Sequence, residues 1–185
     1  MFIQTEDTPN PETLKFLPGE NILKSGTADF SNIESSKVSP LASRLFEVKG
    51  VSRVFFGSDF ISVTKDSGLD WNKLKPSILT GIMEHFSSGL PVLNNIDNND
   101  SEVHDNEDTE TIKQIKDLLE TRVRPAVAMD GGDITFCSFE DGIVTLKMQG
   151  ACAGCPSSTA TLKMGIENML RHYIPEVIEV KAAEL

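Results

Sequence analysis

The chain has 185 residues, of which 39% are hydrophobic and 24% are charged, the composition of an ordinary soluble globular protein. Its formal net charge of −11 argues against a general binder of nucleic acids or anionic membranes. The sequence has no run of about 18 apolar residues, so a membrane span is not expected. Three cysteines, an odd number, do not indicate a secreted disulfide scaffold, so we expect a reducing compartment.

Two β-rich runs in the N-terminal part predict a hairpin. Val51–Phe56 and Phe60–Thr64 flank Gly57-Ser58-Asp59, which suits a three-residue loop. A further strand is expected over Leu14–Leu17, and a short helix over Leu41–Phe46. Strands and helices are therefore expected to share one small domain.

A longer helix is expected after the hairpin. Asp70 is predicted to cap it, and Gly89 and Pro91 to end it. Trp71, near its start, is interpreted as a core anchor. The predicted buried face consists of Leu74, Ile78, Ile82, Met83 and Phe86.

An acidic stretch then divides the chain. Residues 94–110, NNIDNNDSEVHDNEDTE, hold seven acidic residues and no Lys or Arg, and they have almost nothing to bury. Such a composition is typical of a flexible, solvated spacer. We expect two small domains of α/β (α+β) class over residues 1–93 and 109–185, joined by an acidic flexible linker over residues 94–108.

The C-terminal domain begins with a predicted helix capped by Asp108 or Thr109. Pro125 is expected to kink or restart this helix, and Gly131-Gly132 to end it. We interpret Asp130–Asp133 as a helix stop and tight turn rather than a metal-binding loop. The predicted apolar face consists of Ile112, Ile115, Leu118, Leu119 and Val123.

The remaining elements complete an α-β-β-α-β order with a three-stranded sheet. Asp133–Phe139 and Ile143–Met148 flank Glu140-Asp141-Gly142, a strong hairpin signal. Pro156 suits the first turn of a helix, and a last strand is expected over Val177–Val180. The predicted buried face of the last helix consists of Leu162, Ile166, Met169, Leu170 and Tyr173.

Two of the three cysteines lie where a strand leads into this last helix, in the segment QGACAGCPSST. Cys155 precedes Pro156, so the free N–H groups and the positive end of the helix dipole are expected to face it and to lower the thiol pKa. Gly150, Ala151, Ala153 and Gly154 carry almost no side chain, which leaves room for a bulky object near Cys152 and Cys155.

Three kinds of chemistry suit such a pair. A thioredoxin-like redox pair normally has its helix beginning at the first cysteine, and here the helix is expected to begin after the second. A zinc site needs four ligands, and the remaining candidates, Cys137, His85, His104 and His172, are not paired at zinc-finger spacing. An iron–sulfur cluster also takes four thiolates, of which one chain supplies two.

Two copies of the chain together would supply the four thiolates that a cluster needs. A twofold axis beside the loop would place Cys152 and Cys155 of each protomer around one [4Fe–4S] cluster. A cluster held by only two bonds from each protomer favours handover to another protein over permanent storage. A thiol–disulfide redox protein and a zinc-bridged dimer remain alternatives.

Long motifs across both domains carry a family resemblance. Residues 124–177, RPAVAMDGGDITFCSFEDGIVTLKMQGACAGCPSSTATLKMGIENMLRHYIPEV, resemble the NifU-like domain of the Nfu family of iron–sulfur cluster carriers. The N-terminal half carries motifs similar to that family's companion domain: FIQTEDTPNPETLKFLPG, GTADF, SPLASRLF, GVSRVFFGSDFISVTK and IMEHFSSGLPV. The resemblance covers nearly the whole chain except the acidic stretch.

The resemblance implies a [4Fe–4S] cluster that bridges a homodimer through Cys152 and Cys155 and is passed to apo-proteins. It implies recipient apo-proteins and upstream cluster assembly proteins as partners, and neither nucleic acid nor membrane. No Ser/His/Asp arrangement, phosphate-binding loop or dinucleotide motif is present, so we do not expect an enzyme. The architecture is similar to mitochondrial and alphaproteobacterial members of the family.

The other candidate residues have simpler interpretations. Cys137, in a predicted strand, is expected to be buried or half-buried, because free cysteine packs as a small hydrophobe. His85 and His172 are expected in packing or surface roles, and His104 in solvent. Thr8-Pro9-Asn10-Pro11 is interpreted as a turn.

The start of the sequence, MFIQTEDTPNP, has neither a basic start nor an apolar run, and so reads as neither a signal peptide nor a presequence. This favours the bacterial cytoplasm as the compartment. The mitochondrial matrix is the alternative if a presequence has been removed.

Overall fold

The structure, a computed structural model, describes residues 1–94, 108–154 and 156–183, and the side chains of all these except residues 156–158. The chain divides into two compact units, Met1–Asp100 and Ser101–Leu185, which confirms the prediction of two small domains of mixed α and β structure. The predicted linker lies almost entirely within residues 95–107, outside the described residues. No helix in the described ranges is long and apolar enough to cross a membrane.

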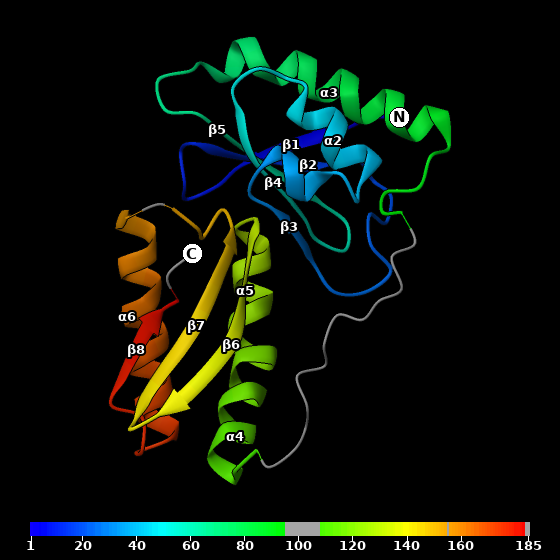
Figure 1. The fold of residues 1–185 in the computed structure, drawn as a ribbon. Helices are drawn as coiled ribbons and strands as arrows, with labels where there is room; N and C mark the ends of the chain where they lie inside the picture. Colours follow the sequence, from blue (N-terminus) through cyan, green and yellow to red (C-terminus); the bar gives the residue numbers. More distant parts are fainter. Residues whose placement is uncertain (95–107, 155, 184–185) are drawn as a thin grey trace. The chain divides into compact units, whose positions relative to one another are not determined.

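The N-terminal unit is built on a five-stranded sheet in the order β1-β2-β5-β4-β3, in which every neighbouring pair is antiparallel (Figure 1). Its elements are β1 (Gln4–Asp7), β2 (Thr13–Leu17), β3 (Ala28–Phe30), α1 (Ile33–Ser36), α2 (Pro40–Phe46), β4 (Val51–Phe56), β5 (Ile61–Lys65) and α3 (Trp71–Ser88). Helices α2 and α3 lie together on one side of the sheet.

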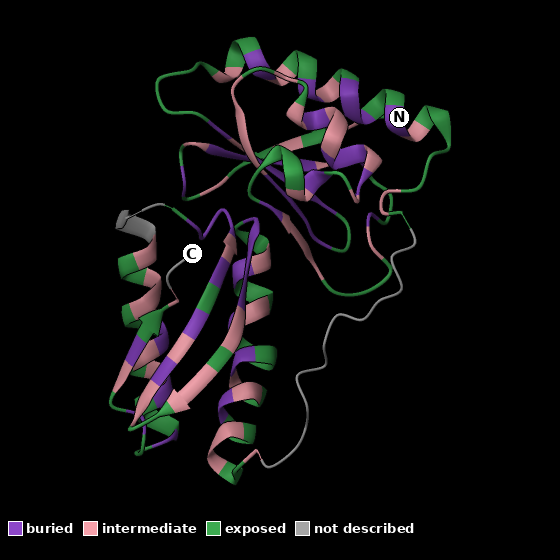
Figure 2. Cartoon of the chain, viewed as in Figure 1, coloured by how far each residue is buried: buried purple, intermediate pink, exposed green. Residues whose placement is uncertain are grey.

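The core of this unit lies between the sheet and these two helices, where Figure 2 shows buried residues on both. Side chains alternate between the faces of a strand, so every second residue of β2, β4 and β5 reaches the core. The core includes Leu14, Phe16, Val54, Phe56, Ile61 and Val63 from the sheet, and Leu41, Leu45, Ile78 and Ile82 from the helices.

The predicted hairpin is confirmed, with a loop one residue longer than expected. The chain leaves β4 at Phe56 and enters β5 at Ile61, and the Gly57 N–H donates to the Phe60 carbonyl at 2.9 Å. The Phe60 ring lies so close to Gly57 that a side chain at residue 57 would collide with it. This packing holds Phe60 in the loop.

Strands β1 and β3 were not predicted. Both are edge strands that pair with a single neighbour, β1 with β2 and β3 with β4. The sequence of β1, QTED, has no apolar face, and β3 is only three residues long. Hydrogen bonding to a neighbour from elsewhere in the chain defines these strands, so no local pattern indicates them.

Helix α3 begins and ends as predicted. Asp70 accepts a hydrogen bond from the Asn72 N–H at 2.9 Å, and Gly89 ends the helix with a left-handed φ of 68°. The predicted buried face of α3 is wrong at one residue, because Met83 is 44% exposed. His85 is fully buried instead. Among the described residues, neither ring nitrogen of His85 finds a hydrogen-bond partner.

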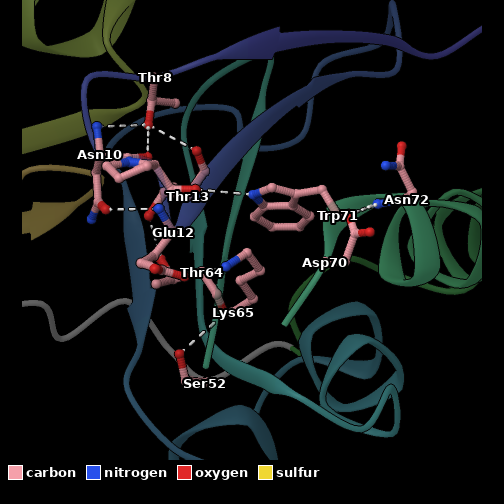
Figure 3. Close-up of polar contacts among 11 residues, drawn as sticks. Thr8, Asn10, Glu12, Thr13, Ser52, Thr64, Lys65, Asp70, Trp71 and Asn72 are labelled. Carbon is pink, nitrogen blue, oxygen red and sulfur yellow. Dashed lines mark hydrogen bonds and ion pairs between the residues drawn. The ribbon is translucent and has the colours of Figure 1, made fainter. Parts of the chain in front are cut away.

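The turn at residues 8–13 connects the sheet to the start of α3 (Figure 3). The Glu12 N–H donates to Asn10 Oδ1 at 3.0 Å, and the Thr13 N–H donates to the Asn10 carbonyl at 2.9 Å, which confirms the predicted turn. Trp71 Nε1 donates to the Pro11 carbonyl at 3.1 Å, and its half-buried ring packs against the core. Trp71 is therefore an anchor with one polar attachment.

The C-terminal unit has the predicted α-β-β-α-β order. Its three-stranded sheet has the order β6-β7-β8, with β6 and β7 antiparallel and β7 and β8 parallel. Its elements are α4 (Glu110–Leu118), a π-helical turn η1 (Leu119–Val123), α5 (Arg124–Met129), β6 (Gly132–Glu140), β7 (Ile143–Gly150), α6 (Pro156–Tyr173) and β8 (Glu179–Ala182).

Short-range sequence features determine where several elements of this unit begin and end. Thr109 caps α4, and the restart predicted at Pro125 is confirmed, since the π-helical turn leads into α5 one residue before it. The β6–β7 hairpin turns through Asp141 and Gly142, whose φ values of 50° and 78° are those of a two-residue hairpin turn.

Two predictions at the end of the chain are wrong. Tyr173 is 48% exposed, and the next residue, Ile174, is buried in its place, because Ile174 continues the one-turn spacing of Ile166 and Leu170. Strand β8 begins at Glu179 rather than at Val177. The N–H groups of Ile178 and Glu179 donate to the Gly142 carbonyl, which fixes where β8 joins the sheet.

The buried His85 predicts a pH-dependent stability of the N-terminal unit. Burial, together with the nearby Arg44 charge, lowers the pKa of His85 below its ordinary value of 6.5. As the pH falls below 6.5, the unfolded chain binds a proton that the folded unit resists, so the free energy of unfolding should decrease. Carboxyl groups contribute only at lower pH, below about 5.

The measurement is urea unfolding of the full chain followed by the fluorescence of Trp71, the only tryptophan. We expect His85→Leu to weaken the loss of stability between pH 6.5 and about 5. His172→Leu, a change at the exposed histidine of the other unit, should leave the Trp71 transition unchanged. An equal pH dependence in wild type and His85→Leu would contradict the prediction.

Candidate functional site

Cys152, one of the two predicted ligands, lies in the tight turn between β7 and α6. Strand β7 ends at Gly150 with a left-handed φ of 63°, and α6 begins at Pro156. The Ala153 N–H donates to the Gly150 carbonyl at 3.1 Å and closes the turn. Cys155 lies outside the described residues, so its position beside Cys152 stays a prediction.

Cys152 is buried in this turn. The residue is 6% exposed and belongs to the apolar core of the C-terminal unit. Thr159 of α6 donates its hydroxyl to the Cys152 carbonyl at 3.0 Å, so the turn is also attached to the helix that follows it. The structure therefore shows a cysteine fixed by both neighbouring elements, with its thiol directed away from solvent.

Gly131 and Gly132, where the chain enters β6, form the floor beneath Cys152. Gly132 pairs with Gly150 in the sheet, and the Ala151 N–H donates to the Gly131 carbonyl at 3.1 Å. A β-carbon on Gly132 would lie 2.6 Å from Cys152 Sγ and 2.7 Å from the Gln149 carbonyl oxygen. The two glycines thus stop the helix, as predicted, and also admit the cysteine turn.

An ion pair between the half-buried Arg124 and the buried Asp133 holds this floor to α5. Asp133, 4% exposed, receives two parallel hydrogen bonds from Arg124, from Nε to Oδ1 and from Nη2 to Oδ2, both at 2.9 Å. Arg124 also donates to Glu120 at 2.6 Å. The Asp133 hydrogen bonds, followed by the Glu120 contact, raise the pKa of Arg124 above its usual range. The guanidinium is therefore a permanent positive charge.

Burial raises the pKa of the Cys152 thiol to about 12, with smaller contributions from the negative charges of Asp130 and Asp133. The lowered thiol pKa expected at the start of the helix concerned Cys155, which is not described. For Cys152 the direction is opposite, because removal from water penalises a thiolate. A metal that binds Cys152 must therefore displace its proton.

The expectation for Cys137 is wrong, since this residue is exposed. The β6–β7 register shifts between Phe136 and Ser138, so Cys137 lies at a β-bulge without a partner residue on β7. The bulge interrupts the alternation from which a buried position was expected. A bulge of this kind depends on the partner strand and has no local signal.

The other candidate ligands do not gather around Cys152. His85 is in the core of the N-terminal unit, His172 is exposed beside the Tyr173 ring, and His104 lies outside the described residues. Within the part of the chain that the structure describes, no group of three or more His, Cys, Asp and Glu side chains is placed to hold a metal ion.

Sequence reasoning did not identify Arg124, Asp133 or Thr159 as parts of this site. Arg124 and Asp133 are nine residues apart with a helix and a turn between them, and no periodic pattern pairs them. Their only signal is their place in the long motif around the cysteines.

The tight packing at Gly132 predicts a steric effect. Gly132→Ala should lower the stability of the C-terminal unit by about 2 kcal/mol, because its new methyl group would overlap Cys152 Sγ and the Gln149 carbonyl. Gly165→Ala on α6 is the matched control: nothing lies within 4 Å of its new β-carbon, and it should stabilise the helix by roughly 0.5–1 kcal/mol.

Circular dichroism of the full chain during denaturation measures both effects, and Trp71 fluorescence identifies the separate transition of the N-terminal unit. A Gly132→Ala chain as stable as Gly165→Ala would show that residue 132 is not packed as described.

Two family models match the chain. That of the scaffold protein Nfu/NifU N-terminal domain matches residues 3–89, and that of the NifU-like domain matches residues 115–181. One solved structure, the solution structure of a NifU-like protein from Saccharomyces cerevisiae, is 29% identical with a TM-score of 0.47. It matches over 51% of this chain and 86% of that chain.

Two curated relatives align with nearly the whole chain. The "NFU1 iron-sulfur cluster scaffold homolog, mitochondrial" of Drosophila willistoni is 54% identical over 98% of this chain and 63% of its own length. "NifU-like protein 4, mitochondrial" of Arabidopsis thaliana is 53% identical over 96% of this chain and 64% of its own length. The chain thus spans less than two thirds of the length of these relatives. With both characteristic domains in order and this level of identity, the chain belongs to the Nfu family.

Proposed function

We propose that this protein is an iron–sulfur cluster scaffold or carrier that holds a [4Fe–4S] cluster between two copies of itself and passes it to apo-proteins. The observation that carries the proposal is the ligand count: each chain offers Cys152 and Cys155, separated by two small residues, at the entry to α6. The name of the Drosophila relative, an iron–sulfur cluster scaffold homolog, supports the same class of cargo.

The cluster is cargo in this proposal. Cys152 and Cys155 of each protomer would supply four thiolates, the number that such a cluster takes. Because each protomer contributes only two of the four bonds, the cysteines of a recipient can replace them stepwise. No bond within the carrier chain is made or broken in this exchange, so the role is binding and delivery and not catalysis.

A thiol–disulfide redox protein is the alternative from another class, and in the conformation shown Cys152 could not be its attacking thiol, which would have to be Cys155. The thiolate is the reactive form of cysteine in disulfide exchange, and the pKa of Cys152 is about 12 in this conformation. A buried, protonated thiol is a poor attacking group. A bound metal ion, by contrast, stabilises the thiolate directly and so offsets its burial.

Anaerobic reconstitution with iron and sulfide tests the proposal. We expect a brown dimer with about four irons and four sulfides per two chains. Cys152→Ala and Cys155→Ala should each abolish cluster binding, because either change leaves half of the ligand set incomplete. Cys137→Ala, a change at an exposed cysteine on β6, should bind the cluster as wild type does.

Iron and sulfide analysis, with native mass spectrometry, decides the outcome. A complete iron centre within a single chain would contradict the shared site. Disulfide reductase activity without iron would support the redox alternative, and a dimer containing zinc but no sulfide after oxygen-free preparation would support a zinc-bridged dimer.

For the N-terminal unit we propose recognition of the recipients or donors of the cluster. It is a compact unit with its own core, and the predicted ligands lie in the other unit. Deletion of residues 1–93 should therefore spare cluster binding and slow transfer to particular apo-proteins, as measured by the rate at which each recipient gains activity. Unchanged transfer rates for every recipient would remove this role.

The mitochondrial names of the Drosophila and Arabidopsis relatives support the mitochondrial matrix as the compartment. The first preference from the sequence, the bacterial cytoplasm, finds no support among these relatives.

A further inference from the structure

Cys152 poses a physical problem for a shared cluster. A cluster held between two chains needs its ligand sulfurs at the surface, but Cys152 is 6% exposed, and its sulfur faces Gly132. If the proposed function holds, on which this inference rests, the Cys152 side chain must turn outward before it binds a cluster. That movement would break the contact between the sulfur and Gly132. The interactions that hold Gly132 in place therefore stabilise the inward position of the side chain.

The contacts of Asp133 hold Gly132. Asp133 follows Gly132 directly, and its carboxylate receives both hydrogen bonds from Arg124 and a third from the Ile134 N–H at 2.8 Å. Arg124 is the first residue of α5 and is itself held by Glu120, one helical turn earlier. The start of β6 is thus attached to the helix beside it through a nearly buried carboxylate.

Arg124 and Asp133 are connected to the Cys152 sulfur through the floor. Their path to it is short, since Gly131 accepts a hydrogen bond from Ala151, and Gly132 lies against Cys152. A fork-to-fork arginine–carboxylate pair fixes distance and angle together, which a single hydrogen bond does not. Loss of Arg124 would remove both hydrogen bonds of the fork and leave the buried Asp133 carboxylate without its opposite charge, which would loosen the floor.

We propose that the Arg124–Asp133 ion pair is a latch that holds the Gly131–Gly132 floor beneath Cys152 and so governs how readily this thiol turns outward to receive and release a cluster. Arg124 and Asp133 are positioning residues. The latch acts in the cluster-free chain, so it can be measured without a cluster.

The measurement is the rate at which iodoacetamide, a neutral reagent, alkylates each cysteine of the full-length, cluster-free chain. A Cys155→Ser background leaves two of the three thiols, and mass spectrometry separates them. Cys137 is exposed on the same sheet and is the internal reference, and Cys152 should react more slowly than Cys137. Arg124→Gln should raise the Cys152 rate about tenfold, the change that corresponds to a difference of about 1.4 kcal/mol, while the Cys137 rate stays the same.

The sign of this change separates the latch from simple electrostatics. Removing the Arg124 charge leaves Asp133 uncompensated, which by itself would stabilise the protonated thiol and slow the reaction. A faster reaction in Arg124→Gln therefore indicates a loosened floor. Arg124→Lys, which keeps the charge but loses the fork, should also accelerate alkylation, by a smaller factor, and it serves if Arg124→Gln does not fold.

Two controls account for other causes. Arg171→Gln removes an exposed arginine that pairs with the half-buried Glu167 on α6, and it should leave the Cys152 rate unchanged. Val180→Ala destabilises the same core at β8 without touching the latch. A Cys152 rate in Arg124→Gln that is unchanged or slower, or that rises no more than in Val180→Ala at equal loss of stability, would overturn the proposal.

Reconstitution of the chain with all cysteines intact keeps the two proposals separate. If wild type takes up no cluster, the proposed function fails while the alkylation result stands on its own. If wild type does take up a cluster, Arg124→Gln should lose it to an iron chelator several times faster than wild type and Arg171→Gln. Equal rates of loss in all three would refute the role of the latch in cluster release.

Discussion

At the start of β6 the backbone passes so close to Cys152 that a β-carbon on Gly132 would lie 2.6 Å from the sulfur. This contact joins the two strands, the turn and α6 into one packed site, because Gly132 also pairs with Gly150 at the end of β7. The side chain of Cys152 packs against the floor, and its carbonyl accepts a hydrogen bond from the Thr159 hydroxyl. The chemistry available to this thiol is therefore limited by backbone packing before any charge is considered.

Charge adds a second constraint in the same place. Asp133 is buried beside the thiol and opposes its ionisation, but it is itself neutralised by Arg124 through two hydrogen bonds. A buried carboxylate without such a partner would cost several kcal/mol. Burial and the neighbouring carboxylates therefore both favour the protonated form of the Cys152 thiol. The same arrangement makes Cys152 itself a poor nucleophile.

The N-terminal unit is organised around an apolar core that contains a buried histidine. Its sheet and two helices enclose one apolar core, and the turn at residues 8–13 is attached to α3 through Trp71 and Pro11. His85 is buried in this core without a hydrogen-bond partner among the described residues, where an apolar side chain would fit the pattern better. The unit thus has its own core with a pH-sensitive position at His85, and the predicted cluster ligands belong to the other unit.

The sequence by itself determined the features that depend on neighbouring residues: the cap at Asp70, the helix restart at Pro125, the hairpin turn at Asp141-Gly142 and the order of elements in the NifU-like domain. It also identified the cysteine pair, because two thiols and small residues are close in the chain. Only the tertiary structure decided the burial of Cys152, the exposure of Cys137 at a bulge and the pairing of Arg124 with Asp133. These depend on which strands and helices meet in space, and contacts between residues distant in the chain leave no periodic trace in a single sequence.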